Sequence, residues 1–129
     1  MIIQLDLESE VPIYLQLKHQ IIEGIATHQL VAGEALPSVR GLAADLGVNM
    51  HTVNKAYQLL KQDGYILIHR QKGVVINPAM PKADQSFVEG LKQELKPLIT
   101  ESICRGMDKE LFFRICEEMF SILEKGGEK

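Results

Sequence analysis

Polar and basic side chains that suit an anionic, hydrogen-bonding partner gather at residues 49–58. His51 and Asn54 can each donate and accept hydrogen bonds, and Lys55 carries a positive charge that suits a phosphate. Asn49 is placed to cap a helix, and the free backbone N–H groups of the next turn also favour a phosphate. This chemistry can recognise base edges and the phosphates beside them. It includes no nucleophile with a supporting base.

The distribution of charge favours the same interpretation, although the whole chain carries a net charge of −3. Residues 40–77 hold five basic side chains against two acidic ones, a net charge of +3, whereas residues 1–39 and 78–129 are both acidic. Any one of these basic residues would fit an ordinary solvated helix. Their concentration around the polar stretch favours a nucleic-acid partner.

Two short helical patterns position these groups, one at residues 38–46 and one at residues 49–62. Ser38 is a good N-cap for the first, although Gly41 stands where a capping box would need Glu or Gln. Gly47 ends this helix and leaves a turn so short that the two helices must cross sharply. That arrangement is typical of a helix-turn-helix, which places its second helix in the major groove of double-stranded DNA.

A helix before this pair and a hairpin after it complete the predicted domain. Apolar residues at four-residue spacing predict a helix over residues 12–28, and a short strand is expected in the connection that follows. Two β-rich segments farther along predict a hairpin with Arg70 and Lys72 at its tip. The expected fold is mostly α with a small β-hairpin (α+β), a winged helix-turn-helix over residues 11–79.

Residues 80–129 are predicted to form two helices after a linker that contains prolines. Pro97 is expected to kink the first helix, Gly106 to end it, and Asp108 to cap the second. About 45 residues in two helices cannot bury both apolar sides of the last helix, so we expect this segment to pair with a second copy of the chain. The expected dimerisation residues are Phe87, Leu91, Leu95, Leu98, Leu111, Phe112, Ile115 and Met119.

The two cysteines, Cys104 and Cys116, lie among apolar residues at helical spacing. Two buried free thiols are the favoured interpretation, and a redox switch is the alternative. A helix reversal near Gly106 would place their Cα atoms roughly 10 Å apart, beyond the ~7 Å that a disulfide allows. We therefore expect no bridge between them.

Three stretches of the sequence resemble the GntR family of transcription regulators. They are PIYLQL, LPSVRGLAADLGVNMHTVNKAYQLLKQDGYI and HRQKG. The resemblance covers about residues 11–77, and the short chain beyond them is similar to the YtrA subfamily. It implies a homodimeric DNA-binding regulator, often a repressor of a transporter operon, with the C-terminal helices as dimerisation elements. A two-fold symmetric dimer would match a palindromic operator.

The resemblance also assigns roles to individual residues. Arg40 takes the place of the family's DNA-contacting arginine, and His51 and Thr52 take the places of contacts at the start of its recognition helix. Arg70, Lys72 and Gly73 match its wing tip. The full set of expected DNA-binding residues is Ser38, Arg40, Asn49, His51, Thr52, Asn54, Lys55, Arg70, Lys72 and Gly73.

Other classes of function find little support in the sequence. No Ser-His-acid or Cys-His spacing and no phosphate-binding glycine loop is present, so no enzyme and no cofactor is expected. The four histidines are scattered over separate elements, so no metal site is expected either. No apolar run reaches the ~18 residues of a membrane span, and the acidic start is unlike a secretory signal, so cytoplasm is the expected location.

A winged-helix module that binds another protein is the alternative function. A flat apolar recognition face would favour that alternative, whereas the face here is polar and basic. The operator sequence, the sign of regulation and any small-molecule effector stay open at this point.

Overall fold

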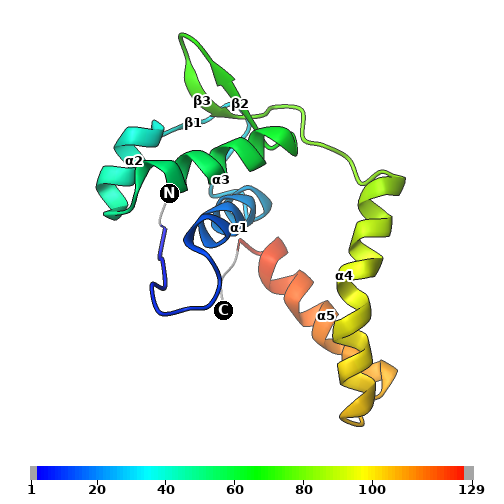
Figure 1. Ribbon diagram of the computed structural model, residues 1–129. Helices are drawn as coiled ribbons and strands as arrows, with labels where there is room; N and C mark the ends of the chain where they lie inside the picture. The colour runs from blue at the N-terminus through cyan, green and yellow to red at the C-terminus, as the bar shows by residue number, and fades with distance from the viewer. Residues whose placement is uncertain (1–2, 127–129) are drawn as a thin grey trace. The chain divides into compact units, whose positions relative to one another are not determined.

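The computed structural model describes residues 3–126 of the 129-residue chain, which fall into two compact units (Figure 1). We call residues 3–81 the N-terminal unit and residues 82–126 the C-terminal unit. The first contains three helices and a small sheet, and the second contains two helices. Each unit is described by itself below.

Helix α1 spans Ile13–Ala26 and forms the base of the N-terminal unit. Leu17 and Ile21, one turn apart, are completely buried, as the four-residue spacing of its apolar residues predicts. Gly24 marks a close approach of the chain, because a Cβ added there would lie 2.9 Å from Leu30 Cδ1. The connection after α1 therefore folds back tightly onto the helix.

An N-terminal arm before α1 is bound by two glutamines one helical turn apart. Gln20 accepts a hydrogen bond from the Gln4 N–H at 2.9 Å and donates to the Gln4 carbonyl. Gln16 accepts from the Asp6 N–H at 2.8 Å and donates to the carbonyls of Asp6 and Val11 at 2.9 and 2.8 Å. These two side chains thus bind backbone groups of the arm.

Helix α2 (Val39–Leu46) and helix α3 (Met50–Gln62) are the predicted helix pair. Gly47, Val48 and Asn49 join them, and Gly47 has a φ of 69°, a left-handed conformation that glycine adopts without strain. Because the chain reverses within so few residues, α2 crosses α3 rather than running along it (Figure 1).

Strands β1 (Ala35–Leu36), β2 (Ile66–His69) and β3 (Gly73–Ile76) form an antiparallel sheet in the order β1-β3-β2. Strands β2 and β3 are the predicted hairpin, and β1 is the short strand expected after the first helix. In the register of β1, Leu36 lies opposite Val74. This pairing attaches the hairpin to the segment that leads into α2.

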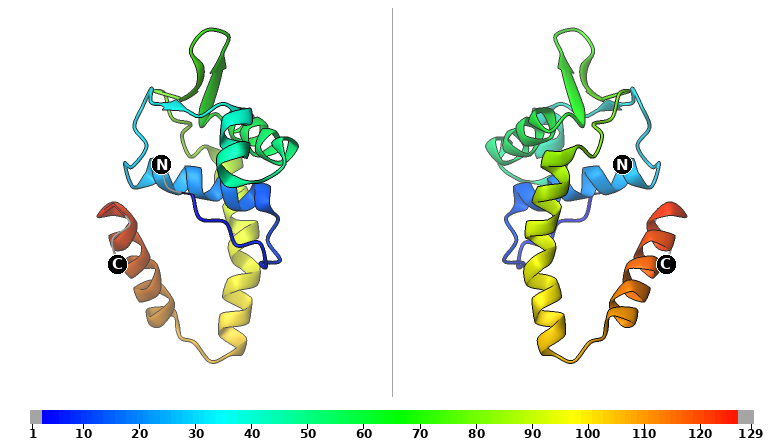
Figure 2. Two further views of the ribbon diagram at one scale, coloured as in Figure 1. Left: turned by 90° about the vertical axis from the view of Figure 1, so that its left-hand side faces the viewer. Right: turned by 90° about the vertical axis from the view of Figure 1, so that its right-hand side faces the viewer.

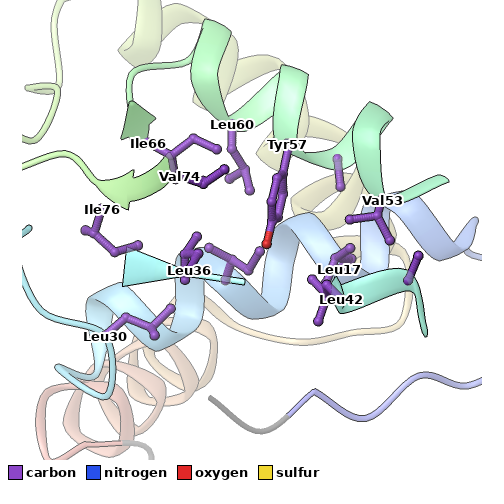
Figure 3. Close-up of a cluster of buried hydrophobic side chains, with 13 residues drawn as sticks. Leu17, Leu30, Leu36, Leu42, Val53, Tyr57, Leu60, Ile66, Val74 and Ile76 are labelled. Atoms are coloured by element: carbon purple, nitrogen blue, oxygen red, sulfur yellow. The ribbon is translucent and has the colours of Figure 1, made fainter. Parts of the chain in front are cut away.

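A hydrophobic core joins the helices of the N-terminal unit to the sheet (Figure 3). Tyr57 is its largest fully buried side chain, and its hydroxyl donates a hydrogen bond to the Pro37 carbonyl at 2.8 Å. The start of α2 is thereby connected to the middle of α3. The buried members of the core are Leu17, Ile21, Leu30, Leu36, Leu42, Ala43, Val53, Ala56, Tyr57, Leu60, Ile66, Val74 and Ile76.

The C-terminal unit consists of α4 (Gln85–Cys104) and α5 (Lys109–Glu124). Helix α4 continues through Pro97, so the helix is not broken there. The predicted reversal lies at Gly106, which has a φ of 81°, and Asp108 caps α5 as expected. The two helices diverge from this reversal (Figure 2), and neither contains a buried residue.

The cysteines depart from the prediction. Both are free, but Cys104 is exposed and Cys116 is only half-buried. The expectation of two buried thiols is wrong because the diverging helices enclose no core within the described part of their unit. Helical spacing identifies the apolar side of each helix, but it does not show whether that side is covered.

Candidate nucleic-acid interface

The first turns of α3 carry several of the predicted contact residues. The Asn49 Oδ1 accepts a hydrogen bond from the His51 N–H at 2.7 Å, which caps the helix and leaves the Asn49 NH₂ group available as a donor. His51 and Asn54 are exposed, and Thr52 is half-buried beside them. The core side of α3 is thus separated from an exposed side that can form hydrogen bonds.

The start of α2 contributes a second set of groups. The Ser38 Oγ accepts from the Gly41 N–H at 3.0 Å, so its hydroxyl hydrogen remains available as a donor. A Cβ at Gly41 would lie 3.1 Å from the Ser38 Oγ, so glycine leaves room for this cap. Arg40 is exposed in the first turn of the helix.

The tip of the β2–β3 hairpin forms the third set. Arg70, Gln71 and Lys72 connect the strands and are exposed, and the hairpin projects away from the helices of its unit (Figure 1). Gly73 begins β3 with a φ of 72°, which favours glycine at this position. Two cations therefore lie at the end of a projecting hairpin.

The charges on these three elements are available to a partner. Lys18 forms a salt bridge with Asp63 at 3.2 Å, which engages one of the two acidic residues in the basic stretch. None of Arg40, Arg70 and Lys72 belongs to a salt bridge within residues 3–126. The net positive charge of this stretch is therefore largely directed to solvent.

Lys55 has a neighbour that the sequence did not predict. Its Nζ lies 4.0 Å from the centroid of the Tyr14 ring on α1, a cation–π contact. The two residues lie on separate helices far apart in sequence, so no local spacing could have identified this pair. The helix pattern did predict the exposed position of Lys55.

The interface lies on a domain with known relatives. Residues 13–76 match the family described as "Bacterial regulatory proteins, gntR family". The chain is 35% identical over 131 aligned residues to the HTH-type transcriptional repressor YtrA of Bacillus subtilis, with 98% of each chain covered. The chain belongs to the GntR family.

Solved structures agree with this assignment and with the predicted fold. A protein described as a transcriptional antiterminator from Listeria monocytogenes is 27% identical, has a TM-score of 0.89, and is matched over 97% of its chain and 100% of this one. YtrA from Sulfolobus acidocaldarius, a GntR-family transcription factor, is 38% identical with a TM-score of 0.56, over 92% of this chain and 97% of its own. GntR proteins are DNA-binding transcription regulators, so this chain is a regulator and not an enzyme.

The C-terminal unit of this GntR regulator exposes many large apolar side chains. Among the predicted dimerisation residues, Leu95 and Phe112 are half-buried. The exposed ones are Phe87, Leu91, Leu98, Leu111, Ile115 and Met119. Sequence reasoning missed Ile103, Phe113 and Phe120, which are 67%, 61% and 67% exposed. The seven-residue spacing of the two phenylalanines was the signal that could have identified them.

An apolar groove of about 340 Å³ lies beside the reversal between α4 and α5. Its walls include Ile99 and Ile103 from α4 and Phe112 and Phe113 from α5. The exposed apolar surface of this unit is therefore hollowed at one end.

Between residues 3 and 126, no His, Cys, Asp or Glu side chains are grouped in threes as metal ligands. In the same range, no helix is both long enough and apolar enough to span a membrane.

Proposed function

We propose that this GntR protein is a homodimeric repressor that binds a palindromic DNA operator. One observation carries the DNA-binding part: α3 starts with a capped, exposed polar turn, in a stretch of net charge +3 within an acidic chain. A helix of this kind fits the major groove, where base edges are distinguishable by their hydrogen-bonding groups.

In this proposal the exposed side of α3 reads base edges. His51 and Asn54 supply ring and amide groups that donate and accept hydrogen bonds, and Thr52 supplies a hydroxyl beside them. An Asn side chain can form two hydrogen bonds with adenine, which gives it a direct part in sequence preference. The capped start of the helix holds these groups in a defined orientation.

The remaining residues contact the DNA backbone. Arg40 and Lys55 supply charges to phosphates, and Ser38 and Asn49 supply the donors left free by their capping bonds. At the wing, Arg70 and Lys72 reach the neighbouring backbone or minor groove, and Gly73 permits the turn. Such contacts fix the position of the protein on the duplex without reading its sequence.

Selection of binding sequences from random DNA, followed by affinity measurements on variants, tests these roles. Asn54→Ala is expected to change the preferred base at one position of each half-site, at a cost of ~1–3 kcal/mol. Lys72→Ala is the matched comparison: it should weaken binding to all sequences alike and make the salt dependence less steep.

Two results would contradict this assignment. An Asn54→Ala protein that selects the same operator with the same affinity would show that the exposed side of α3 does not read bases. Binding that stays constant between low and physiological salt would show that phosphate contacts are not a main contribution.

The dimer part of the proposal rests on the uncovered surface of the C-terminal unit. Neither α4 nor α5 has a buried residue in the single chain, although both carry apolar side chains along their length. Exposed apolar surface of this extent marks an interaction site. A second copy of the same unit would cover it and would bring two DNA-binding units to one operator.

Charged substitutions in the apolar surface test the dimer. Leu98→Glu and Met119→Glu place a carboxylate on side chains that are both 57% exposed in the single chain. Both variants are expected to sediment as monomers at concentrations where the unmodified protein is a dimer, since a buried unpaired charge costs several kcal/mol. Glu117→Gln, on the polar side of α5, is the control and should leave the dimer intact.

Repression is proposed because the B. subtilis relative, which is aligned over 98% of this chain, is described as a repressor. The family resemblance also suggests that the regulated genes are a transporter operon. The protein is proposed to act in the cytoplasm. Chromatin immunoprecipitation would identify the genes bound, and transcript levels after deletion of the gene would give the sign of regulation. Increased transcription of the bound genes is the expected result.

A further inference from the structure

The contact between Lys55 and Tyr14 connects the exposed side of α3 to α1. The Lys55 Nζ lies 4.0 Å from the centroid of the Tyr14 ring. Tyr14 is half-buried and packs against the hydrophobic core, so its ring has a supported position. Lys55 is exposed, and no described residue forms a salt bridge with it.

The contact with Tyr14 directs the Lys55 ammonium toward α1. At about 100° per residue, His51 and Gln58 lie opposite the buried row, and Lys55 lies toward the side of Thr52 and Leu59, both half-buried. Asn54 lies toward the other side. Lys55 itself lies within about 40° of His51 around the helix, so it is the contact with Tyr14 that turns its ammonium toward α1 and the flank of the exposed face.

A lysine whose ammonium extends to the flank of a recognition helix needs a constraint to make a defined phosphate contact. A free lysine side chain has several rotatable bonds, and ordering it on binding costs conformational entropy. An aromatic ring beneath the ammonium restricts that freedom before DNA arrives. The ammonium has three N–H donors, so contact with one ring face leaves donors for a phosphate oxygen.

We propose that Tyr14 is a positioning residue that holds Lys55 for contact with a DNA phosphate. The proposal rests on the proposed DNA-binding function and deepens it. Tyr14 acts through its ring face, and the hydroxyl group is not required. The consequence is that α1, although it is outside the helix-turn-helix, contributes to DNA affinity through Lys55.

A double-mutant cycle on the full-length protein tests this inference. The variants are Tyr14→Leu, which removes the ring but keeps an apolar side chain against the core, Lys55→Met, which removes the charge, and the combination of both. Tyr14→Phe is the conservative comparison, because it keeps the ring face. Affinity for the selected operator is measured over a range of salt concentrations, and thermal unfolding checks that every variant is folded at the temperature of the assay.

We expect Tyr14→Leu to weaken binding about two- to fivefold when Lys55 is present, because the freed lysine side chain must then be ordered on binding. In the Lys55→Met background the same change should have no further effect. Lys55→Met should reduce the slope of log affinity against log salt by about one, and Tyr14→Phe should retain most of the affinity.

Each of three results would overturn the inference while the unmodified protein still binds its operator. Equal losses from Tyr14→Leu in both backgrounds would show that the ring does not act through Lys55. A Tyr14→Phe protein as weak as Tyr14→Leu would show that the hydroxyl is the active group. An unchanged salt slope in Lys55→Met would show that Lys55 contacts no phosphate. Failure of the unmodified protein to bind any selected DNA would instead contradict the proposed function.

Discussion

One hydroxyl group connects the two helices of the helix-turn-helix. The Tyr57 hydroxyl of α3 donates to the Pro37 carbonyl, directly before the cap of α2, at 2.8 Å. Tyr57→Phe keeps the buried ring and removes this bond, so it should lower the free energy of unfolding by about 1 kcal/mol. Chemical denaturation measures the loss. Tyr65→Phe is the control, because the described residues provide no partner for its hydroxyl, and it should change stability little.

The buried Tyr57 phenol also predicts that the free energy of unfolding depends on pH in the alkaline range. Burial raises the pKa of the Tyr57 phenol well above its usual value near 10. Above about pH 10 the unfolded state loses this proton more readily than the folded state, so the free energy of unfolding falls as pH rises. Below that pH both states hold the proton, and Tyr57 adds no pH dependence.

Denaturation curves between pH 9 and pH 11 would separate this effect from other alkaline titrations. The unmodified protein should lose stability more steeply than Tyr57→Phe, by up to about 1.4 kcal/mol per pH unit. Equal slopes for the two proteins would show that ionisation of Tyr57 is not coupled to unfolding.

At the level of elements, the turn between α2 and α3 depends on a left-handed residue. Gly47 has a φ of 69°, and a Cβ added there would meet no atom within 4 Å, so only backbone strain opposes a larger residue. Gly47→Ala should lower the free energy of unfolding by about 1–2 kcal/mol. Gly47→Asn should cost less, because Asn tolerates this conformation better. Thermal unfolding would test the order, and an Ala variant at least as stable as the Asn variant would contradict it.

The N-terminal arm supplies a second prediction about an element. The amide N–H groups of Gln4 and Asp6 are bound by Gln20 and Gln16 of α1. A protein with Gln16→Leu and Gln20→Leu should release the arm, so these two amides should exchange with solvent faster by hydrogen-exchange NMR. The amides in the middle of α3 should keep their protection. Unchanged exchange at Gln4 and Asp6 would show that other contacts hold the arm.

The sequence predicts the elements that depend on residues close together in the chain, and it does not predict contacts between residues far apart. The helices, the caps at Ser38 and Asn49 and the reversal at Gly47 follow from signals within a few residues, and the structure agrees with them. The Lys55–Tyr14 contact joins residues on different helices. No local sequence pattern predicts such a contact, because the two residues come together only after the chain has folded.

The same reasoning explains why the prediction that Cys104 is buried is wrong. Helical spacing correctly places it beside apolar residues, but burial depends on what packs against that side. No residue between 3 and 126 covers Cys104 in the single chain, and its side chain is exposed. A surface that awaits a partner has the same sequence pattern as a surface inside a core.

At the scale of the whole molecule, the division at Pro81 predicts that DNA binding and dimerisation can be separated. The N-terminal unit has its own core, so a chain that ends at Pro81 should fold and remain monomeric. It should bind the operator about 10²–10⁴-fold more weakly than the full chain, because two linked DNA-binding units gain from effective concentration. Sedimentation and operator titration would measure both properties. A shortened chain that still dimerises, or that binds as tightly, would contradict the proposed role of α4 and α5.

The coreless C-terminal unit also bears on how long each copy survives in a cell. In the proposed homodimer, an unpaired copy presents two helices without a buried side chain. Proteases cleave segments that open readily, and few internal contacts make opening easy. Newly made copies at low abundance would then be degraded faster than paired ones, because pairing depends on concentration. The amount of active regulator would therefore rise more steeply than the rate of its synthesis.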